Sequence, residues 1–166
     1  MRILGIDPGL AATGYGLIEI DDQSRYQYVE FGVIATPTGL AEAERLKILH
    51  FELTELINRD LPQSSAVEKL YFQKNVKTAL SVGQARGVVL LTLAQAGLPV
   101  FEYNPNEVKQ TVCGYGNADK NQVQHMVKTL LNLQDIPKPD DASDALAIAI
   151  CHIHHQSFND AVQRLG

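Results

Sequence analysis

RILGIDPGL, residues 2–10, runs an apolar stretch into an aspartate and then into Pro8-Gly9. The apolar residues predict a short buried strand over residues 2–7. Pro8 favours an extended backbone at Asp7, so we expect the strand to end there. Aspartate is common as the first residue of a turn, and turn chemistry alone explains this stretch. A functional interpretation of Asp7 therefore depends on the rest of the chain.

The composition is that of an ordinary globular protein. Of the 166 residues, 45% are hydrophobic and 20% are charged. No apolar run is long enough to span a bilayer, and the N-terminus lacks a secretory pattern. Cys113 and Cys151 show no disulfide-framework spacing, which suits a reducing compartment and predicts a cytoplasmic protein. The net charge of -5 by itself argues mildly against a nucleic-acid partner, because phosphates select basic surfaces.

Hydrophobic periodicity predicts three strands, followed by alternating helices and strands. The expected strands are 2–7, 13–20, 26–34, 65–68 and 99–103, and the expected helices are 40–58, 78–96, 106–112, 120–131 and 141–155. A hairpin-rich start followed by alternation indicates an α/β fold with a mixed sheet flanked by helices. No repeat or linker interrupts the chain. We therefore expect one domain over residues 1–166, with residues 157–166 as a candidate loose tail.

Four acidic residues occupy positions where ligand sites form. Asp7 and Glu68 each end a predicted strand, and ligands bind at that edge of an open α/β sheet. Asp141 and Asp144 are three residues apart in the last helix, so they share a helical face. Acids in a first helical turn also cap free N–H groups and suit the helix dipole. Asp144, however, begins a strongly apolar helix, where an acid needs a partner.

Four carboxylates at one sheet edge would repel one another. No run of Lys or Arg lies near them in the sequence to neutralise them. A set of oxygen ligands without Cys or His fits Mg²⁺ or Mn²⁺ better than zinc. Two such ions, roughly 4 Å apart, are typical of in-line phosphodiester hydrolysis. The ions would offset most of the negative net charge, so the acidity does not exclude DNA.

Five segments, in this order, resemble the RuvC family of bacterial Holliday-junction resolvases. They are GIDPGLAATGYG (5–16), AVEKLYFQKN (66–75), SVGQARG (81–87), FEYNPNEVKQTVCGYGNADKNQVQHMV (101–127) and PDDASDALAIAICH (139–152). The first segment alone would be weak evidence, but the others together are highly specific. The resemblance extends from Arg2 to about His154.

The resemblance implies a ribonuclease-H-like fold, with a mixed five-stranded sheet flanked by helices. It implies a Mg²⁺-dependent, structure-selective endodeoxyribonuclease that resolves four-way DNA junctions by paired symmetric nicks during recombination and repair. Two Mg²⁺ ions per subunit are expected, with Mn²⁺ as a substitute. The family works as a homodimer and acts with the RuvA–RuvB branch-migration complex, so these are the expected partners.

The family's functional residues carry over position by position. The four catalytic and metal-binding acids correspond to Asp7, Glu68, Asp141 and Asp144, and Asp140 is an extra neighbour. Two lysines near the active centre correspond to Lys109 and Lys120.

The segment after Glu68 combines aromatic and basic residues. The family's stacking aromatic, three residues after the catalytic Glu, is usually Phe, whereas this chain has Tyr71 followed by Phe72. Rings beside basic residues can stack on unpaired bases, while Lys74 and Lys77 would hold phosphates. We expect Tyr71 to stack and Phe72 to pack on the core, although the sequence leaves this choice open.

Other polar residues have two interpretations each. Arg86 is either a phosphate contact or a solvated or paired arginine. His125 is either structural or close to the DNA. The cluster Cys151, His152, His154 and His155 lacks a second ligand pair for zinc, so we interpret it as polar residues on an exposed helix end.

The long helix expected at 78–96 suggests a dimer contact. Val82, Val88, Val89 and Leu93 exceed what one helix face should bury.

Three other functions remain open from the sequence. An ATPase or kinase of the actin and sugar-kinase type also opens with a strand, an Asp-x-Gly turn and a hairpin, but needs two such lobes. A nuclease of the same fold could act on RNA or other DNA. A non-catalytic junction-binding module would not need the complete set of acids.

Overall fold

The computed structural model describes residues 1–21, 23, 25–69 and 76–165, with side chains at all of these except 76–78 and 158–165. Five strands form one mixed sheet in the order β3-β2-β1-β4-β5. The strands are β1 (Arg2–Asp7), β2 (Ala12–Ile20), β3 (Tyr26–Ala35), β4 (Ser64–Glu68) and β5 (Val100–Tyr103). The first three are antiparallel, and β1, β4 and β5 are parallel. The predicted mixed five-stranded sheet is confirmed.

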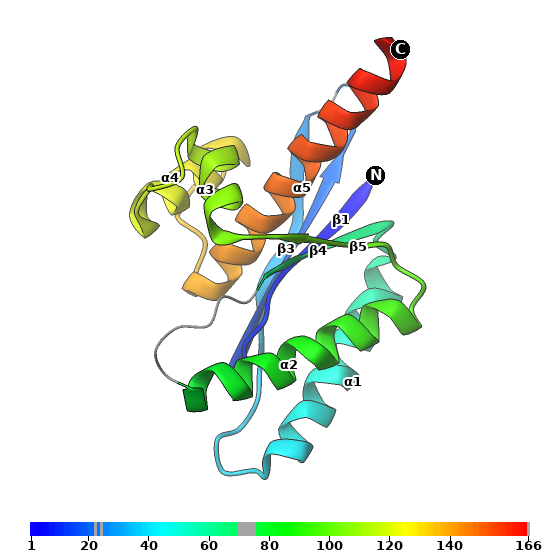
Figure 1. The fold of residues 1–166 in the computed structure, drawn as a ribbon, viewed down its shortest axis with the longest axis vertical. Coiled ribbons are helices and arrows are strands. Elements are labelled where there is room, and N and C mark those ends of the chain that lie inside the picture. The colour runs from blue at the N-terminus through cyan, green and yellow to red at the C-terminus, as the bar shows by residue number, and fades with distance from the viewer. Residues whose placement is uncertain (22, 24, 70–75, 166) are drawn as a thin grey trace.

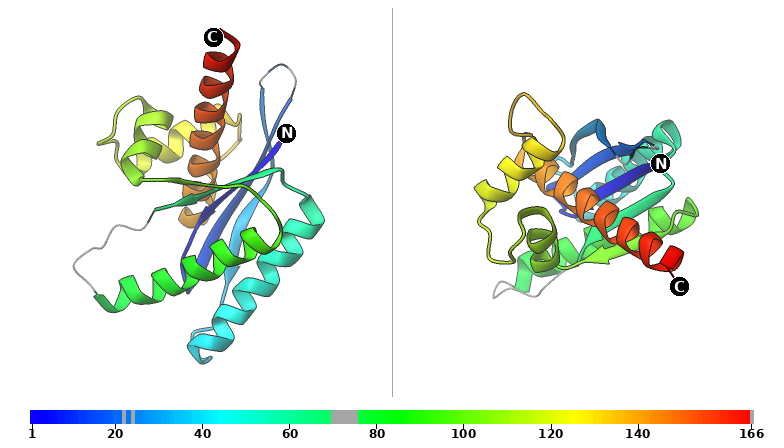
Figure 2. Two further views of the ribbon diagram at one scale, coloured as in Figure 1. Left: turned by 45° about the vertical axis from the view of Figure 1, so that its right-hand side comes forward. Right: turned by 90° about the horizontal axis from the view of Figure 1, so that it is seen from above.

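Helices cover both faces of the sheet (Figures 1 and 2). They are α1 (Glu42–Asp60), α2 (Val76–Gln95), α3 (Pro105–Cys113), α4 (Lys120–Leu130) and α5 (Asp140–Leu165). Successive strand residues point to opposite faces, so Ile3 packs with α3, α4 and α5, whereas Leu4 packs with α1 and α2. Both faces of β1 are therefore apolar, which explains its unbroken hydrophobic run.

The helix expected at 141–155 is longer than the sequence indicated. Helix α5 begins at Asp140 and continues to Leu165, so nearly all of the segment expected as a loose tail is helical. Its upper end projects beyond the sheet in Figure 1. No helix in the described part of the chain is long and apolar enough to cross a membrane.

Helix α2 buries a different set of residues from the one predicted. Val89 and Leu93 are fully buried against the sheet, so they are not surplus apolar surface. Val82 and Val88 are only half-buried. The exposed apolar side chains of this helix are instead Leu80 and Leu91, which are 64% and 56% accessible.

Glycines in β1 and β2 let α5 lie directly on the sheet. A Cβ atom added at Gly5 would collide with the backbone carbonyl of Ala145, and one added at Gly14 would collide with that of Asp141. At Gly16 it would meet the side chain of Leu146. The start of α5 therefore lies against the ends of β1 and β2 where Asp7 emerges.

Candidate active site

Asp7 and Glu68 lie side by side at one edge of the sheet. Strands β1 and β4 are parallel neighbours, with Ile6 paired to Val67, and the two acids are the next residues of each strand. Both strands end at the same level, so both carboxylates emerge where ligands of an α/β sheet bind.

Asp141 and Asp144 reach the same edge from α5. They lie in the first turns of this helix, three residues apart, and both are half-buried. Gly14, which is the β2 partner of Asp7, lies directly against the backbone of Asp141. This contact holds the start of α5 beside the end of β1. The structure thus brings together the four acids that the sequence predicted.

Burial and mutual repulsion raise the pKa values of Asp7 and Glu68 at this site. Burial, followed by the charges of Glu68, Asp144 and Asp141, raises the pKa of Asp7 to about 8. Burial also raises the pKa of Glu68 to about 6, with Asp144 contributing. These shifts mean that the acids lie close enough to disfavour one another's charged forms.

Lysines from other elements approach the acids. Lys120 Nζ donates to Asp144 Oδ2 at 3.0 Å and lies 3.4 Å from Asp140 Oδ2. Lys109 is near enough to lower the pKa of Glu68, although burial dominates that pKa. A pocket of about 220 Å³ is lined by both lysines together with Glu68 and Asp144. The sequence showed no cations beside the acids because these lysines belong to α3 and α4.

Asp140 shares Lys120 with Asp144 but has further partners of its own. Lys138 donates to its Oδ1 at 2.9 Å, and Gln124 Nε2 donates to the same oxygen at 3.0 Å. These hydrogen bonds, followed by the charge of Lys120, lower the pKa of Asp140 to about 2. An exposed and already paired carboxylate agrees with its interpretation as an extra neighbour.

The donor set fits a hard divalent cation. The four side chains at this edge offer only carboxylate oxygens, and the raised pKa of Asp7 shows that its charge lacks a sufficient counterion. Among the described residues, no three potential ligands already converge into a metal-holding cluster.

The predicted DNA contacts are only partly described. Tyr71, Phe72 and Lys74 lie outside the described residues, and for Lys77 only the backbone, in the first turn of α2, is described. Arg86 forms a salt bridge with Glu102, and its Nε donates to the backbone carbonyl of Glu68 at 3.3 Å. This arrangement favours the paired-arginine interpretation, and it ties α2 to the end of β4.

The cluster near the end of α5 differs from its interpretation as an exposed polar end. Cys151 and His152 are buried, whereas His154 and His155 are exposed. His152 forms hydrogen bonds with the hydroxyls of Ser64 at 2.8 Å and Tyr103 at 2.9 Å. Burial lowers the pKa of His152 to about 4, so it is a neutral structural residue at neutral pH. The sequence missed this because both hydroxyls come from distant strands.

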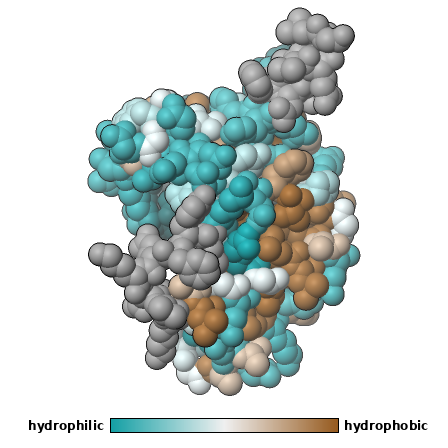
Figure 3. All heavy atoms as spheres, viewed as in Figure 1, coloured by the Kyte–Doolittle hydropathy of each residue, from teal (hydrophilic) through white to brown (hydrophobic). Residues whose placement is uncertain are grey.

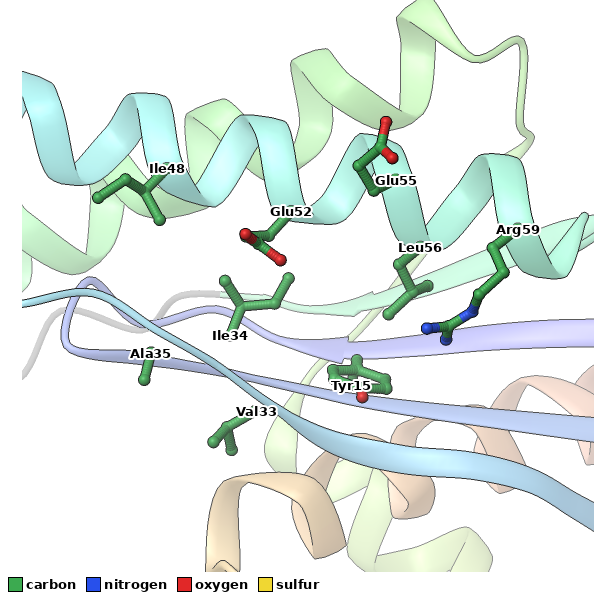
Figure 4. Close-up of a pocket in the computed structure, with 9 residues that line it drawn as sticks. All are labelled: Tyr15, Val33, Ile34, Ala35, Ile48, Glu52, Glu55, Leu56 and Arg59. Atoms are coloured by element: carbon green, nitrogen blue, oxygen red, sulfur yellow. The ribbon is translucent and has the colours of Figure 1, made fainter.

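A larger pocket of about 470 Å³ lies away from these acids (Figure 4). It lies between α1 and strands β2 and β3, with Tyr15, Glu52 and Arg59 on its walls. None of the predicted site residues lines it. Its size alone therefore does not make it the active site.

Comparisons with known proteins assign the chain to one family. The family model "Crossover junction endodeoxyribonuclease RuvC" matches residues 3–152. The chain is 58% identical over 159 residues to the RuvC of Halothermothrix orenii, covering 96% of each chain. It is 56% identical over 158 residues to that of Pelotomaculum thermopropionicum, covering 95% of this chain and 96% of the relative.

Solved structures give the same result. The structure of T. thermophilus RuvC in complex with a Holliday junction substrate matches with a TM-score of 0.90 and 34% identity over 96% of each chain. The yeast mitochondrial Holliday junction resolvase Ydc2 matches with a TM-score of 0.66 at 15% identity, covering 93% of this chain and 80% of the other, which shows a shared fold.

Proposed function

The chain belongs to the RuvC family of crossover junction endodeoxyribonucleases and is therefore a nuclease that hydrolyses DNA at Holliday junctions in recombination and repair, and we propose that Asp7, Glu68, Asp141 and Asp144 carry this hydrolysis with bound divalent cations. The observation that supports this assignment is the convergence of these four acids, with the pKa of Asp7 raised to about 8. A cation would relieve that repulsion.

The proposed ions are two Mg²⁺ per subunit, with Mn²⁺ able to replace them. Such ions would activate the attacking water and stabilise the leaving oxygen. Asp7 and Glu68 project from the ends of rigid strands, and Asp141 and Asp144 from the start of α5, so the protein fixes the ligands from two directions. Their role is to hold the ions and orient the phosphodiester between them.

The lysines have a separate role in this proposal. Lys120 lies within ion-pair distance of Asp144, so it can compensate that carboxylate before an ion binds. With Asp144 holding a cation, Lys120 would be available to contact phosphate, together with Lys109 from their common pocket.

Tyr71, Phe72, Lys74 and Lys77 remain proposed DNA contacts because aromatic and basic residues alternate after Glu68, and Tyr71 stands where the family has its stacking aromatic. Arg86 is the less favoured proposed contact, because it already pairs with Glu102.

We further propose that the chain works as a homodimer. A four-way junction needs two nicks related by two-fold symmetry, and one set of four acids forms only one active centre. The exposed face of α2 offers a contact surface, with Leu80, Gln84, Gly87 and Leu91 following one another at helical spacing. RuvA–RuvB as partner complex, a cytoplasmic location and a single nuclease domain over residues 1–166 belong to the same proposal.

One experiment tests the function against its alternatives. The protein is incubated with a four-way junction, with a linear duplex of the same sequence, and with ATP, each with and without Mg²⁺. We expect Mg²⁺-dependent cleavage of the junction alone. Equal cleavage of the linear duplex would indicate a general nuclease, ATP hydrolysis would indicate the kinase-like alternative, and binding without cleavage would indicate a non-catalytic module.

A further inference from the structure

Arg45 in α1 holds a positive charge among neutral oxygens. Its Nε donates to Thr36 Oγ1 at 2.9 Å, and its Nη2 lies 3.3 Å from the backbone carbonyl of Leu10, to which it donates. Other arginines with described side chains form salt bridges with carboxylates: Arg2, Arg25, Arg59 and Arg86. Within the described part of the chain, Arg45 has no such partner. Its guanidinium is therefore fixed in position but keeps its charge uncompensated.

The surroundings of Arg45 form a pocket that adjoins the acids. A cavity of about 460 Å³ is lined by the β1–β2 turn (residues 9–12), Arg45, Ser81, Val82 and Asp141. The turn follows Asp7 directly, and Asp141 is one of the four acids. A group bound beside Arg45 would thus lie next to the proposed catalytic centre.

Two pockets therefore border the acids, one beside α3 and α4 and the other beside α1 and α2. The pocket of Lys109 and Lys120 lies on the face covered by α3, α4 and α5, and it includes Glu68 and Asp144. The pocket of Arg45 lies towards α1 and α2, and it includes Asp141. A DNA strand that passes across a cut site carries phosphates on both sides of the cut. The structure has Lys109 and Lys120 in one pocket and Arg45 in the other.

We propose that Arg45, with the hydroxyl of Ser81, binds a backbone phosphate of the cleaved strand, on the side of the cut opposite Lys109 and Lys120. This inference rests on the proposed function, and it adds a phosphate-binding site to it. The negative charge of Asp141 in the same pocket would repel a phosphate. A cation held by the four acids would offset this repulsion. Arg45 is a positioning residue, because it holds the strand rather than the reacting atoms.

The test measures junction binding as a function of salt concentration. Arg45→Gln is made in a Glu68→Gln background, so that the junction remains uncut while its affinity is measured in Mg²⁺. The matched control is Lys47→Gln, which removes a positive charge two residues along α1. Lys47 is exposed and already pairs with Glu44 at 3.3 Å. Both variants change the net charge equally.

We expect Arg45→Gln to weaken junction binding about tenfold, because a charge-assisted contact is lost. The slope of log affinity against log salt should become shallower by about one unit. Lys47→Gln should leave the slope unchanged. If Arg45→Gln has the same slope as the control, the phosphate site is wrong.

A purely structural role for Arg45 predicts a different result. In that case Arg45→Gln would lower the melting temperature by releasing Leu10 and Thr36, while the salt slope stayed constant. Arg45→Lys separates the two roles, because lysine keeps the charge but cannot reproduce both hydrogen bonds. We expect Arg45→Lys to retain the wild-type salt slope even if it melts earlier, and a slope as shallow as that of Arg45→Gln would overturn the proposal. Failure of the proposed function would show separately, as wild-type protein that does not cut the junction in Mg²⁺.

Discussion

Gly14 faces the backbone carbonyl of Asp141 so closely that no side chain fits between the sheet and α5. Gly14 is also the β2 partner of Asp7 in the antiparallel pair of β1 and β2. One contact between helix and sheet therefore sets the position of Asp141 relative to Asp7. The distance between these two proposed catalytic acids thus depends on the absence of a side chain at residue 14.

Gly14→Ala should displace the start of α5 and separate the acids. Overpacking at such a contact costs about 1–3 kcal/mol of stability, and cleavage should fall by more than the loss of folded protein explains. Thermal unfolding and junction cleavage at a temperature where the variant is folded test this. The control is Gly39→Ala, because a Cβ atom at Gly39 would meet nothing within 4 Å. Wild-type cleavage by Gly14→Ala would mean that the contact does not position Asp141.

Replacing any of the four acids by its amide should abolish cleavage while junction binding survives. The variants are Asp7→Asn, Glu68→Gln, Asp141→Asn and Asp144→Asn. Each removes a negative charge from the proposed metal site, and loss of negative charge should help DNA to approach. Gel-shift and nicking assays on the same junction separate binding from catalysis. A variant that nicks at the wild-type rate would remove its residue from the site.

Asp7→Asn should also stabilise the metal-free protein at pH 8. The pKa of Asp7 is raised to about 8 in the folded protein, above its ordinary value of 3.8. The folded state therefore binds more protons than the unfolded state between these values, and stability falls as the pH rises from about 4 to 8. The amide removes this penalty, with a gain on the order of several kcal/mol at pH 8.

Melting in EDTA at pH 5 and pH 8 provides the measurement. The gain from Asp7→Asn should be larger at pH 8. Asp140→Asn is the control with the opposite sign, because hydrogen bonds from Lys138 and Gln124 lower the pKa of Asp140 to about 2. A stability gain for Asp7→Asn that did not change between the two pH values would show that the charge of Asp7 is not the cause.

Hydrophobic periodicity predicted most of the fold. The positions of acids at the ends of strands and at the start of the last helix predicted the four acids of the candidate site. Asp7 and Glu68 end apolar strands, and this pattern is local in the sequence. The approach of Lys120 to Asp144 and the burial of His152 were not predictable in this way, because each depends on packing between elements far apart in the chain. Val89 and Leu93 were misassigned for a related reason: a helix on a sheet buries a wider face than periodicity alone indicates.

Lys109→Ala and Lys120→Ala should weaken junction binding or cleavage without unfolding the protein. Each lost phosphate contact should reduce the salt slope by roughly one unit. Lys128→Ala on α4 is a suitable control, since Lys128 does not line the pocket shared by Lys109 and Lys120. An unchanged slope together with unchanged cleavage would return both lysines to the role of solvated surface residues.

The dimer can be tested through the outward face of α2. Leu91 is 56% accessible on this helix, and a Cβ atom at Gly87, one turn earlier, would meet nothing within 4 Å. Val82 is a poorer choice, because it is half-buried and lines the pocket beside Asp141. Leu91→Glu should therefore place a charge in the proposed interface without disturbing the core or the acids.

We expect Leu91→Glu to be a folded monomer that nicks a junction but rarely makes two paired cuts, because each chain holds one active centre. Sedimentation measures the mass, and a cruciform plasmid separates nicked circles from linear products. The matched control is Phe51→Glu, which changes an apolar residue of similar exposure, 60% accessible, on α1 instead of α2. A monomeric Leu91→Glu that linearised the plasmid as efficiently as the wild type would end the argument for a dimer. A variant that remained dimeric would place the interface on another surface, because a charge buried without a partner at the centre of an apolar contact is too costly to keep.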